Sequence, residues 1–328
     1  MHSELVPQLQ DKKNKTINYS NMSVGLYAFT LGLAKKVLIA DSLAKVVNIG
    51  FLHFHKINSA TALCAMLSYT LQLYFDFSGY CDMAVGMAKM FNIELPYNFN
   101  SPYKAKSISE FWDRWHMTLT RFFTQYVYIP LGGSRKGKLR TYLNTMIIFL
   151  LSGIWHGANW TFIYWGMLHG FLMTVEKIGK DLKISCKRFP KILTRAFNVV
   201  RILLTFGIVN LLWIYFRMDS IEEAKFFIKR LFGGGWELKP EMMQKVNDMI
   251  EIRLLGRFGL NSFFDMYPWV PYISILLILT FAVFFMRNTQ EKLKTNKYNI
   301  QRSIVTIGLL FWCIISLSDV SEFLYFNF

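Results

Sequence analysis

Three runs of this sequence contain no charged residue: YISILLILTFAVFFM at 272–286, ILLTFGIVNLLWIYF at 202–216 and SIVTIGLLFWCIISL at 303–317. With their flanks, these runs approach the roughly 20 apolar residues that a helix needs to cross a bilayer. The chain is 53% hydrophobic and 17% aromatic, with a mean hydropathy of +0.27, which is too apolar for a soluble domain of 328 residues. The sequence therefore predicts a multi-pass protein of the cell membrane whose apolar runs are spans.

Hydrophobic periodicity predicts an all-α chain with a single membrane-embedded domain, 1–328, and no internal repeat. Two further segments suggest helices that do not simply cross. The stretch 143–177 has two short apolar arms joined at WHGANW, which predicts a re-entrant hairpin, and 220–233 predicts an amphipathic helix lying along the interface. Apolar helices are expected near 23–43, 60–91, 141–156, 160–176, 199–217, 269–286 and 303–318.

The formal charge of +16 does not indicate nucleic-acid binding, because the basic residues fall between the apolar runs and form no continuous face. The clusters at 135–140, 177–195 and 287–302 instead predict cytoplasmic loops under the positive-inside rule, with the C-terminus outside. The four cysteines are scattered without a CxxC pair. Those in apolar surroundings are expected to pack as small hydrophobic side chains.

The segment SISEFWDRWHMTLTRFF places a histidine among aromatic residues. Ser107 and Glu110 form a capping-box pattern, so a helix is expected to begin there, with Trp112 and His116 one turn apart on its apolar face and Glu110 paired with Arg114. Two readings are open from the pattern. The helix is an interfacial one with a hydrogen-bonded histidine, or it presents a polar group to a buried site.

His156 and His169 lie on the predicted hairpin, where the spacing of glycines also predicts close helix packing. Ionisable groups inside a membrane segment are costly, so they mark a functional site, a polar pathway or a hydrogen-bonded structural role. The histidine spacings match no local metal motif, and no metal site is predicted. Asp76 and Asp82 lie in an apolar helix and need partners, either bases such as Lys89 or Arg114 or backbone groups near Gly79, or else they bind a polar substrate.

Taken together, two stretches resemble the membrane-bound O-acyltransferase family, specifically its alginate O-acetyltransferase branch. The stretch 72–133 contains DFSGY, FWDRWH and YIPLGG, and the stretch 152–170 reads SGIWHGANWTFIYWGMLHG. The resemblance implies a helical membrane bundle that transfers an acetyl group to hydroxyls of a cell-surface or exported polysaccharide. It also implies that His156, the histidine of WHG, is catalytic and that His116 is a second polar active-site residue.

In that chemistry an acyl thioester, acetyl-CoA or an acyl carrier, is the donor substrate, and no cofactor is bound. His156 is expected to act as general base, while His116 orients the acceptor or donates a hydrogen bond to the developing oxyanion. We also expect His169, Asp76, Trp112 and Trp155 to contact substrate, and a periplasmic or extracellular acetyl-transfer protein as a partner. Two alternatives are D-alanyl transfer to teichoic acid and a non-enzymatic subunit of a polysaccharide export complex.

The sequence departs from the family pattern in two respects. Thr124 and Gln125 stand where the alginate-type branch usually has an Arg-Asp pair, and Asp113 stands where a second arginine is common. These are positions at which charges could hold the loop or bind the donor. Family members also usually carry several further N-terminal spans, so the chain is expected to be a form lacking N-terminal transmembrane helices.

Overall fold

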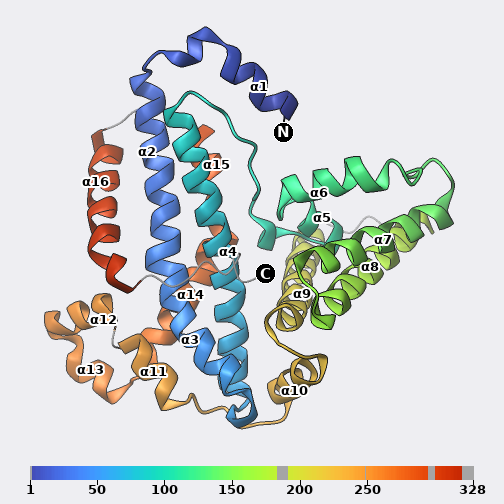
Figure 1. Ribbon diagram of the computed structural model, residues 1–328. Coiled ribbons are helices and arrows are strands. Elements are labelled where there is room, and N and C mark those ends of the chain that lie inside the picture. Colours follow the sequence, from blue (N-terminus) through green and yellow to red (C-terminus); the bar gives the residue numbers. More distant parts are fainter. Residues whose placement is uncertain (1, 183–190, 248, 295–299, 320–328) are drawn as a thin grey trace.

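The computed structural model describes residues 2–182, 191–247, 249–294 and 300–319, and within these ranges the chain is helical without a β-strand (Figure 1). The expected all-α class is therefore confirmed. The apolar helices, all close to their predicted positions, are α2 (Tyr19–Ala34) continuing through η2 (Lys35–Ala40) and α3 (Asp41–Leu52), α4 (Ser59–Met90), α7 (Lys138–His156), α8 (Trp160–Asp181), α9 (Lys191–Arg217), α14 (Val270–Phe285) and α16 (Ile300–Ile315).

Shorter elements connect and cover these helices. The chain between the long helices forms α1 (His2–Gln10), α5 (Ile108–Trp112), α6 (Met117–Phe123), η5 (Thr124–Tyr128), α10 (Ile221–Phe232), α11 (Pro240–Asn247), α12 (Ile250–Leu255), η6 (Gly256–Leu260), α13 (Asn261–Met266) and α15 (Thr289–Lys294). Single 3-10 turns occupy Lys12–Lys15, Phe54–Lys56, Pro102–Lys104 and Ser316–Asp319.

Helices α2 and α4 run side by side and approach each other unusually closely. A Cβ atom at Gly32 would lie 2.5 Å from the carbonyl oxygen of Gly79, and one at Gly86 would lie 2.5 Å from the backbone nitrogen of Phe29. Only glycine permits this separation, which is how helices commonly pack in membranes, where small residues let backbones touch. The pair forms the centre of one half of the molecule, with α14, α15 and α16 beside it (Figure 1).

Helices α7 and α8 form the predicted hairpin, joined by residues 157–159 (Figure 1). Asn159 caps α8 by accepting a hydrogen bond from the backbone nitrogen of Thr161, at 3.1 Å. The glycines act as expected, because a Cβ at Gly153 or Gly166 would lie within 2.4 Å of a carbonyl oxygen on the facing helix. The hairpin is thus confirmed, whereas the depth of its turn in a bilayer stays a prediction.

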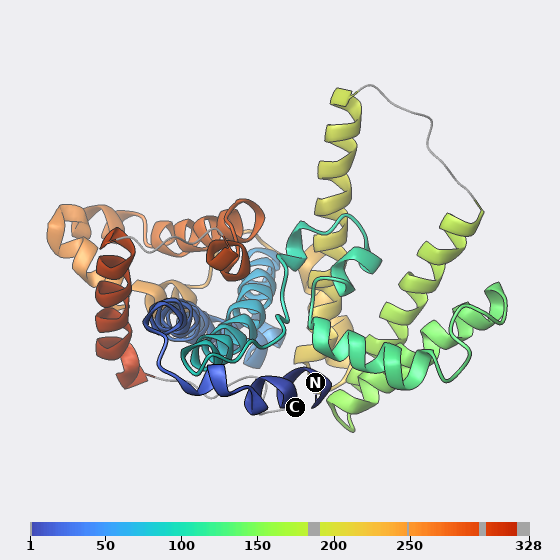
Figure 2. The ribbon, with the colours of Figure 1, turned by 90° about the horizontal axis from the view of Figure 1, so that it is seen from above.

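Seen from above, α5 to α9 form the second half of the molecule, and α9 and α10 pack against α4 to join the halves (Figure 2). The predicted amphipathic segment is α10, capped by Ser220, whose hydroxyl accepts a hydrogen bond from the backbone nitrogen of Glu223. Three of the four cysteines, Cys64, Cys81 and Cys313, are buried free thiols, as predicted, and Cys186 lies outside the described residues.

Within the described ranges, two helices are long and apolar enough to cross a membrane on their own: Tyr19–Leu52 and Thr194–Arg217. Ile252–Met266 and Val270–Phe285 meet the same test only as a pair bent by 106°. Large apolar side chains also point outward, since Leu204 on α9, Phe281 on α14 and Ile304 on α16 are each about 60% exposed. Such surfaces suit a lipid environment, and the chain is a membrane protein.

Candidate active site

His116 interrupts the helix that the sequence predicts for this segment. α5 ends at Trp112, and α6 begins after His116, whose backbone is left-handed with φ 45° and ψ 52°. The prediction of one continuous helix with Trp112 and His116 stacked on one face is therefore wrong. The start of the segment is as predicted: Ser107 caps α5, and the Arg114 guanidinium pairs with Glu110 at 2.7 Å.

Asn98, from the irregular segment between α4 and α5, supplies the reason for the break. Its side-chain oxygen accepts hydrogen bonds from the backbone nitrogen of Thr118 at 3.1 Å and from the Thr118 hydroxyl at 2.6 Å. Its backbone oxygen accepts from the nitrogen of Met117 at 3.0 Å. The unpaired N–H groups that a helix start exposes are thus satisfied by a residue distant in sequence, so α6 can begin here.

The same oxygen of Asn98 fixes the proton on the His116 ring. Nδ1 of His116 lies 3.2 Å from Asn98 Oδ1, and that oxygen, which already accepts two hydrogen bonds from Thr118, cannot donate. Nδ1 therefore carries the proton, and Nε2 of a neutral His116 is a hydrogen-bond acceptor. His116 is 9% exposed, and its ring edge packs on Phe77 at 4.8 Å between centroids.

His156 ends α7 at the turn of the hairpin and sits in an aromatic box. Its ring makes edge contacts with Trp155, Trp165 and Phe216, with centroid separations of 4.9, 5.4 and 5.0 Å. The side chain is half-buried, and it lies near enough to His116 for an electrostatic interaction between the two imidazoles. The structure thus brings together the two histidines that the sequence singled out.

Trp112 and His169 form a hydrogen-bonded pair next to this aromatic box, because Trp165 contacts both His169 and His156. Nε1 of Trp112 donates to Nδ1 of His169 at 3.2 Å, and the Trp165 ring lies 5.0 Å from His169 and 5.4 Å from His156. His169 is fully buried, so in this state it contacts protein side chains and anchors α5 to α8. Trp155 is 50% exposed at the end of α7, where its ring is accessible. That His169, Trp112 and Trp155 contact substrate stays a prediction.

The prediction that Lys89 or Arg114 pairs with Asp76 and Asp82 is wrong. Asp76 lies 2.8 Å from the ammonium of Lys36, and Asp82 pairs with the ammonium of Lys35. Both bases come from η2, in the facing helix, and not from Lys89 or from the FWDRWH segment. Lys89 pairs with Glu94 instead. The packing of α2 on α4 brings these groups together, which sequence spacing alone does not reveal.

A cavity of about 250 Å³ extends between α5, α6, α7 and α8, and Trp112 is part of its lining. Ser152 lines it, one turn before His156 on α7, and the half-buried Lys177 contributes a cation. A wider opening of about 540 Å³ adjoins it through shared lining residues. The three positions that depart from the family pattern, Asp113, Thr124 and Gln125, all line this space.

Two side chains that shape the candidate site, Asn98 and Trp165, were not expected from the sequence. Asn98 lies in an irregular stretch with no periodic signal, and Trp165 looks like an ordinary apolar helix residue. The repeated tryptophans around WHG are the one signal that could have indicated an aromatic box. In the described ranges, no three His, Cys, Asp or Glu side chains gather closely enough to hold a metal ion.

Comparison with known proteins gives one family match. Residues 1–218 match the model of the membrane-bound O-acyltransferase family. A peptidoglycan O-acetyltransferase of Helicobacter pylori is 40% identical over 336 residues, covering 100% of this chain and 60% of the relative. A probable alginate O-acetylase, AlgI, of Pseudomonas syringae pv. tomato is 38% identical, covering 77% of this chain and 48% of the relative.

A teichoic acid D-alanyltransferase of Bacillus subtilis is more distant, at 29% identity over 56% of this chain and 48% of the relative. The chain thus spans about half to three-fifths of the length of these relatives.

Proposed function

The chain belongs to the membrane-bound O-acyltransferase family, and from this premise we propose that it transfers an acetyl group to hydroxyls of a cell-surface or exported polysaccharide. The relatives are named for acetylation of peptidoglycan and of alginate, which are both glycans. The proposed setting is the cell membrane, crossed several times by the chain. The donor is an acyl thioester, either acetyl-CoA or an acyl carrier, and the acetyl-transfer partner is a periplasmic or extracellular protein.

The observation that carries the proposal is the position of His156 at the hairpin turn, boxed by aromatic rings and close to His116. A half-buried imidazole among apolar rings is expected to stay neutral, and a neutral imidazole can accept a proton. No sequence-local pair of nucleophile and base accompanies it, so direct transfer without an acyl-enzyme is the simplest chemistry.

In the proposed reaction, a ring nitrogen of His156 takes the proton of the acceptor hydroxyl as its oxygen attacks the thioester carbonyl carbon. The tetrahedral oxyanion then collapses. The new ester C–O bond remains, the C–S bond breaks, and the thiolate leaves with the proton that His156 returns to it. Atoms and charge balance, and the enzyme is restored.

The tautomer inferred for His116 supports one of its two expected roles. With Nδ1 protonated toward Asn98, Nε2 accepts a hydrogen bond, which suits orientation of a hydroxyl or of a water molecule. Donation to an oxyanion from Nε2 would require the imidazolium, which is disfavoured in so buried a position. We therefore assign His116 to acceptor orientation. The cavity that Ser152 lines, one turn before His156, is proposed to receive the donor, with Lys177 near its negatively charged groups.

The test is an acyl-transfer assay with purified protein in detergent. The rate is measured as the release of free thiol from acetyl-CoA, with and without a glycan acceptor. His156→Ala should lower the rate by about 10²- to 10⁴-fold, the usual contribution of a general base. His53→Ala, at an exposed histidine at the end of α3, is the matched control and should keep the rate.

Three results would contradict the proposal. Normal transfer by folded His156→Ala protein would remove the base assignment. Transfer of D-alanyl but not acetyl groups would favour the teichoic acid reaction. Absence of transfer from acetyl-CoA and from an acyl carrier, with glycan transport intact, would favour a subunit of an export complex.

A further inference from the structure

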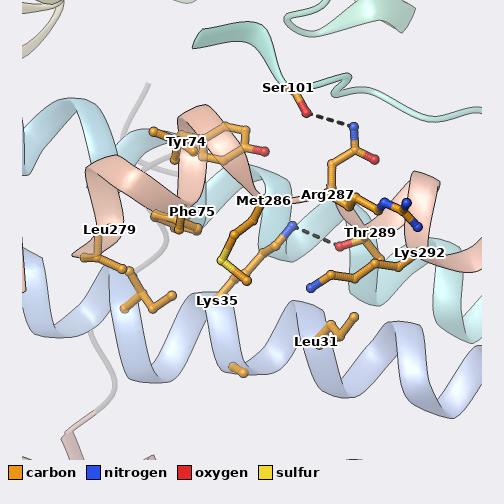
Figure 3. A pocket seen from close by; sticks show the side chains of 15 residues that line it. Leu31, Lys35, Tyr74, Phe75, Ser101, Leu279, Met286, Arg287, Thr289 and Lys292 are labelled. Atoms are coloured by element: carbon orange, nitrogen blue, oxygen red, sulfur yellow. Dashed lines mark hydrogen bonds between the residues drawn. The ribbon is translucent and has the colours of Figure 1, made fainter. Parts of the chain in front are cut away.

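The irregular segment between α4 and α5 is anchored at both of its sides. Ser101 lines a cavity of about 210 Å³ between α2, α4, α14 and α15, and its hydroxyl accepts a hydrogen bond from Nδ2 of Asn288 at 3.0 Å (Figure 3). The same nitrogen donates to Oδ1 of Asn100 at 3.2 Å. On the other side, the backbone nitrogen of Asn100 donates to the backbone oxygen of Arg114 at 2.9 Å. The segment is thus held between the start of α15 and the residues that join α5 to α6.

The orientation of the Asn98 amide, within this segment, follows from its contacts. The backbone nitrogen of Thr118 can only donate, so the Asn98 atom 3.1 Å from it is the side-chain oxygen. The amide nitrogen then points the other way and donates to Sγ of Cys81 on α4, at 3.4 Å. A flip of the amide would oppose two donors at Thr118, which excludes it. The Asn98 atom beside Nδ1 of His116 is therefore an acceptor.

The chemical type of this partner matters for His116. A carboxylate next to the ring would favour the imidazolium, whereas a neutral amide oxygen orders Nδ1–H without stabilising a positive charge. The nearby titratable groups add no net charge to this balance. His156 on α7 interacts electrostatically with His116, and the ion pair of Lys35 and Asp82 lies across a space of about 10 Å³ that Asn98 also lines.

We propose that Asn98 is a positioning residue for acyl transfer, which selects the neutral, Nδ1-protonated form of His116 and so directs an accepting Nε2 to the acceptor hydroxyl. The inference rests on the proposed function for the use that the reaction makes of His116. The hold on the ring itself rests on the contacts of Asn98 with His116, Thr118 and Cys81.

The first measurement reads the tautomer of His116 by nitrogen NMR of the purified full chain in detergent, with isotopically labelled histidine. Among the six histidines, the signals of His116 are those that His116→Asn removes. The wild-type chain should show Nδ1–H, and Asn98→Ala should show a mixture of tautomers. Asn98→Asp should keep Nδ1–H, since its carboxylate accepts the same hydrogen bonds, but His116 should become protonated at a pH about 1–3 units higher than in the wild type.

The second measurement is the rate of acyl transfer. Asn98→Ala should lower kcat about five- to tenfold, the effect of one hydrogen bond, and leave the KM for acetyl-CoA unchanged. As the pH falls, Asn98→Asp should lose transfer at a higher pH than the wild type, because an imidazolium cannot accept at Nε2. Asn100→Asp adds the same charge in the same segment, where its side chain faces Asn288, and is the matched control; it should keep the Nδ1–H tautomer and shift the titration of His116 less.

Two results would overturn the proposal. One is protonation of Nε2 instead of Nδ1 in neutral His116 of the wild-type chain. The other is a tautomer and a titration of His116 that stay unchanged in both Asn98→Ala and Asn98→Asp; if Asn98→Ala fails to fold, Asn98→Asp alone decides. Absence of transfer from the wild-type chain would instead contradict the function proposed above, whereas the NMR readouts need no transfer and still decide whether Asn98 sets the state of His116.

Discussion

Replacement of Lys36 by methionine tests the buried ion cluster at the centre of the first half of the molecule. The ammonium of Lys36 lies 2.8 Å from Oδ1 of Asp41 and 2.8 Å from Oδ1 of Asp76, and the three side chains are between 2% and 5% exposed. Methionine keeps the length and apolar stem of lysine but removes its charge, which leaves two carboxylates facing each other in the interior.

Removing one partner of a buried ion pair typically costs about 3–5 kcal/mol, because an uncompensated charge remains away from water. At about 2–4 °C per kcal/mol, Lys36→Met should lower the thermal midpoint by roughly 6–20 °C. Tryptophan fluorescence during heating in detergent, at one fixed scan rate, measures the shift. Lys56→Met, at an exposed lysine, is the control and should move the midpoint little.

The neutral triple variant Lys36→Met, Asp41→Asn, Asp76→Asn separates the electrostatic reason from simple misfitting. Replacement of a whole buried ion cluster by neutral groups is often close to neutral, so most of the lost stability should return. A triple variant less stable than Lys36→Met alone would refute this reasoning. Asp76→Asn alone should keep the fold, with Lys36 still paired to Asp41. If that protein is stable but loses acyl transfer, the result supports the substrate contact expected of Asp76 from the sequence.

The remaining predictions concern the site, the N-terminal helix and the hairpin. His116 has left-handed backbone, which asparagine tolerates better than alanine does, so the His116→Asn protein should be more stable than the His116→Ala protein. Both variants should lose most of the acyl-transfer activity. Equal thermal midpoints of the two variants would contradict the stability ranking. The hydrogen bond from Arg121 on α6 lowers the pKa of Glu4 on α1. The ion pair between the two helices should therefore be present above pH 4.5 and be lost as the pH falls through the lowered pKa of Glu4. Proteolysis of α1 across that range should accelerate only at the acidic end. Lys138 lies 4.0 Å from Asp181, so cysteines at these two positions should label from the same side of the membrane; labelling from opposite sides would break the hairpin topology.

Features that depend on local pattern were predictable from the sequence. Each apolar run forms a helix in the structure. Apolar residues three and four positions apart share one helix face, so the periodicity and length of a run are enough to predict the helix. The glycines of the hairpin were equally readable, because their spacing places Gly153 and Gly166 on facing surfaces. The cap at Ser107 and the pair formed by Glu110 and Arg114 also needed only near neighbours.

Features that depend on residues distant in the sequence were not predictable from the sequence. His116 lies in a sequence that favours a continuous helix, yet Asn98, 18 residues earlier, satisfies the N–H groups of a new helix start and so stabilises the break. Likewise, Lys35 and Lys36 are adjacent, but consecutive residues of a helix point about 100° apart, so Lys35 reaches Asp82 while Lys36 reaches Asp41 and Asp76. Two neighbouring lysines thereby serve separate purposes, one inside the bundle and one at the edge of the cavity between α2, α4, α14 and α15. η2 is a π-helical turn, a feature frequent at functional sites, and it lies where the ion cluster of Lys36 meets the cavity edge at Lys35. The same geometry explains why substitutions at the two lysines should differ: Lys36→Met removes the charge between Asp41 and Asp76, whereas a change at Lys35 removes the partner of Asp82 at the edge of the cavity.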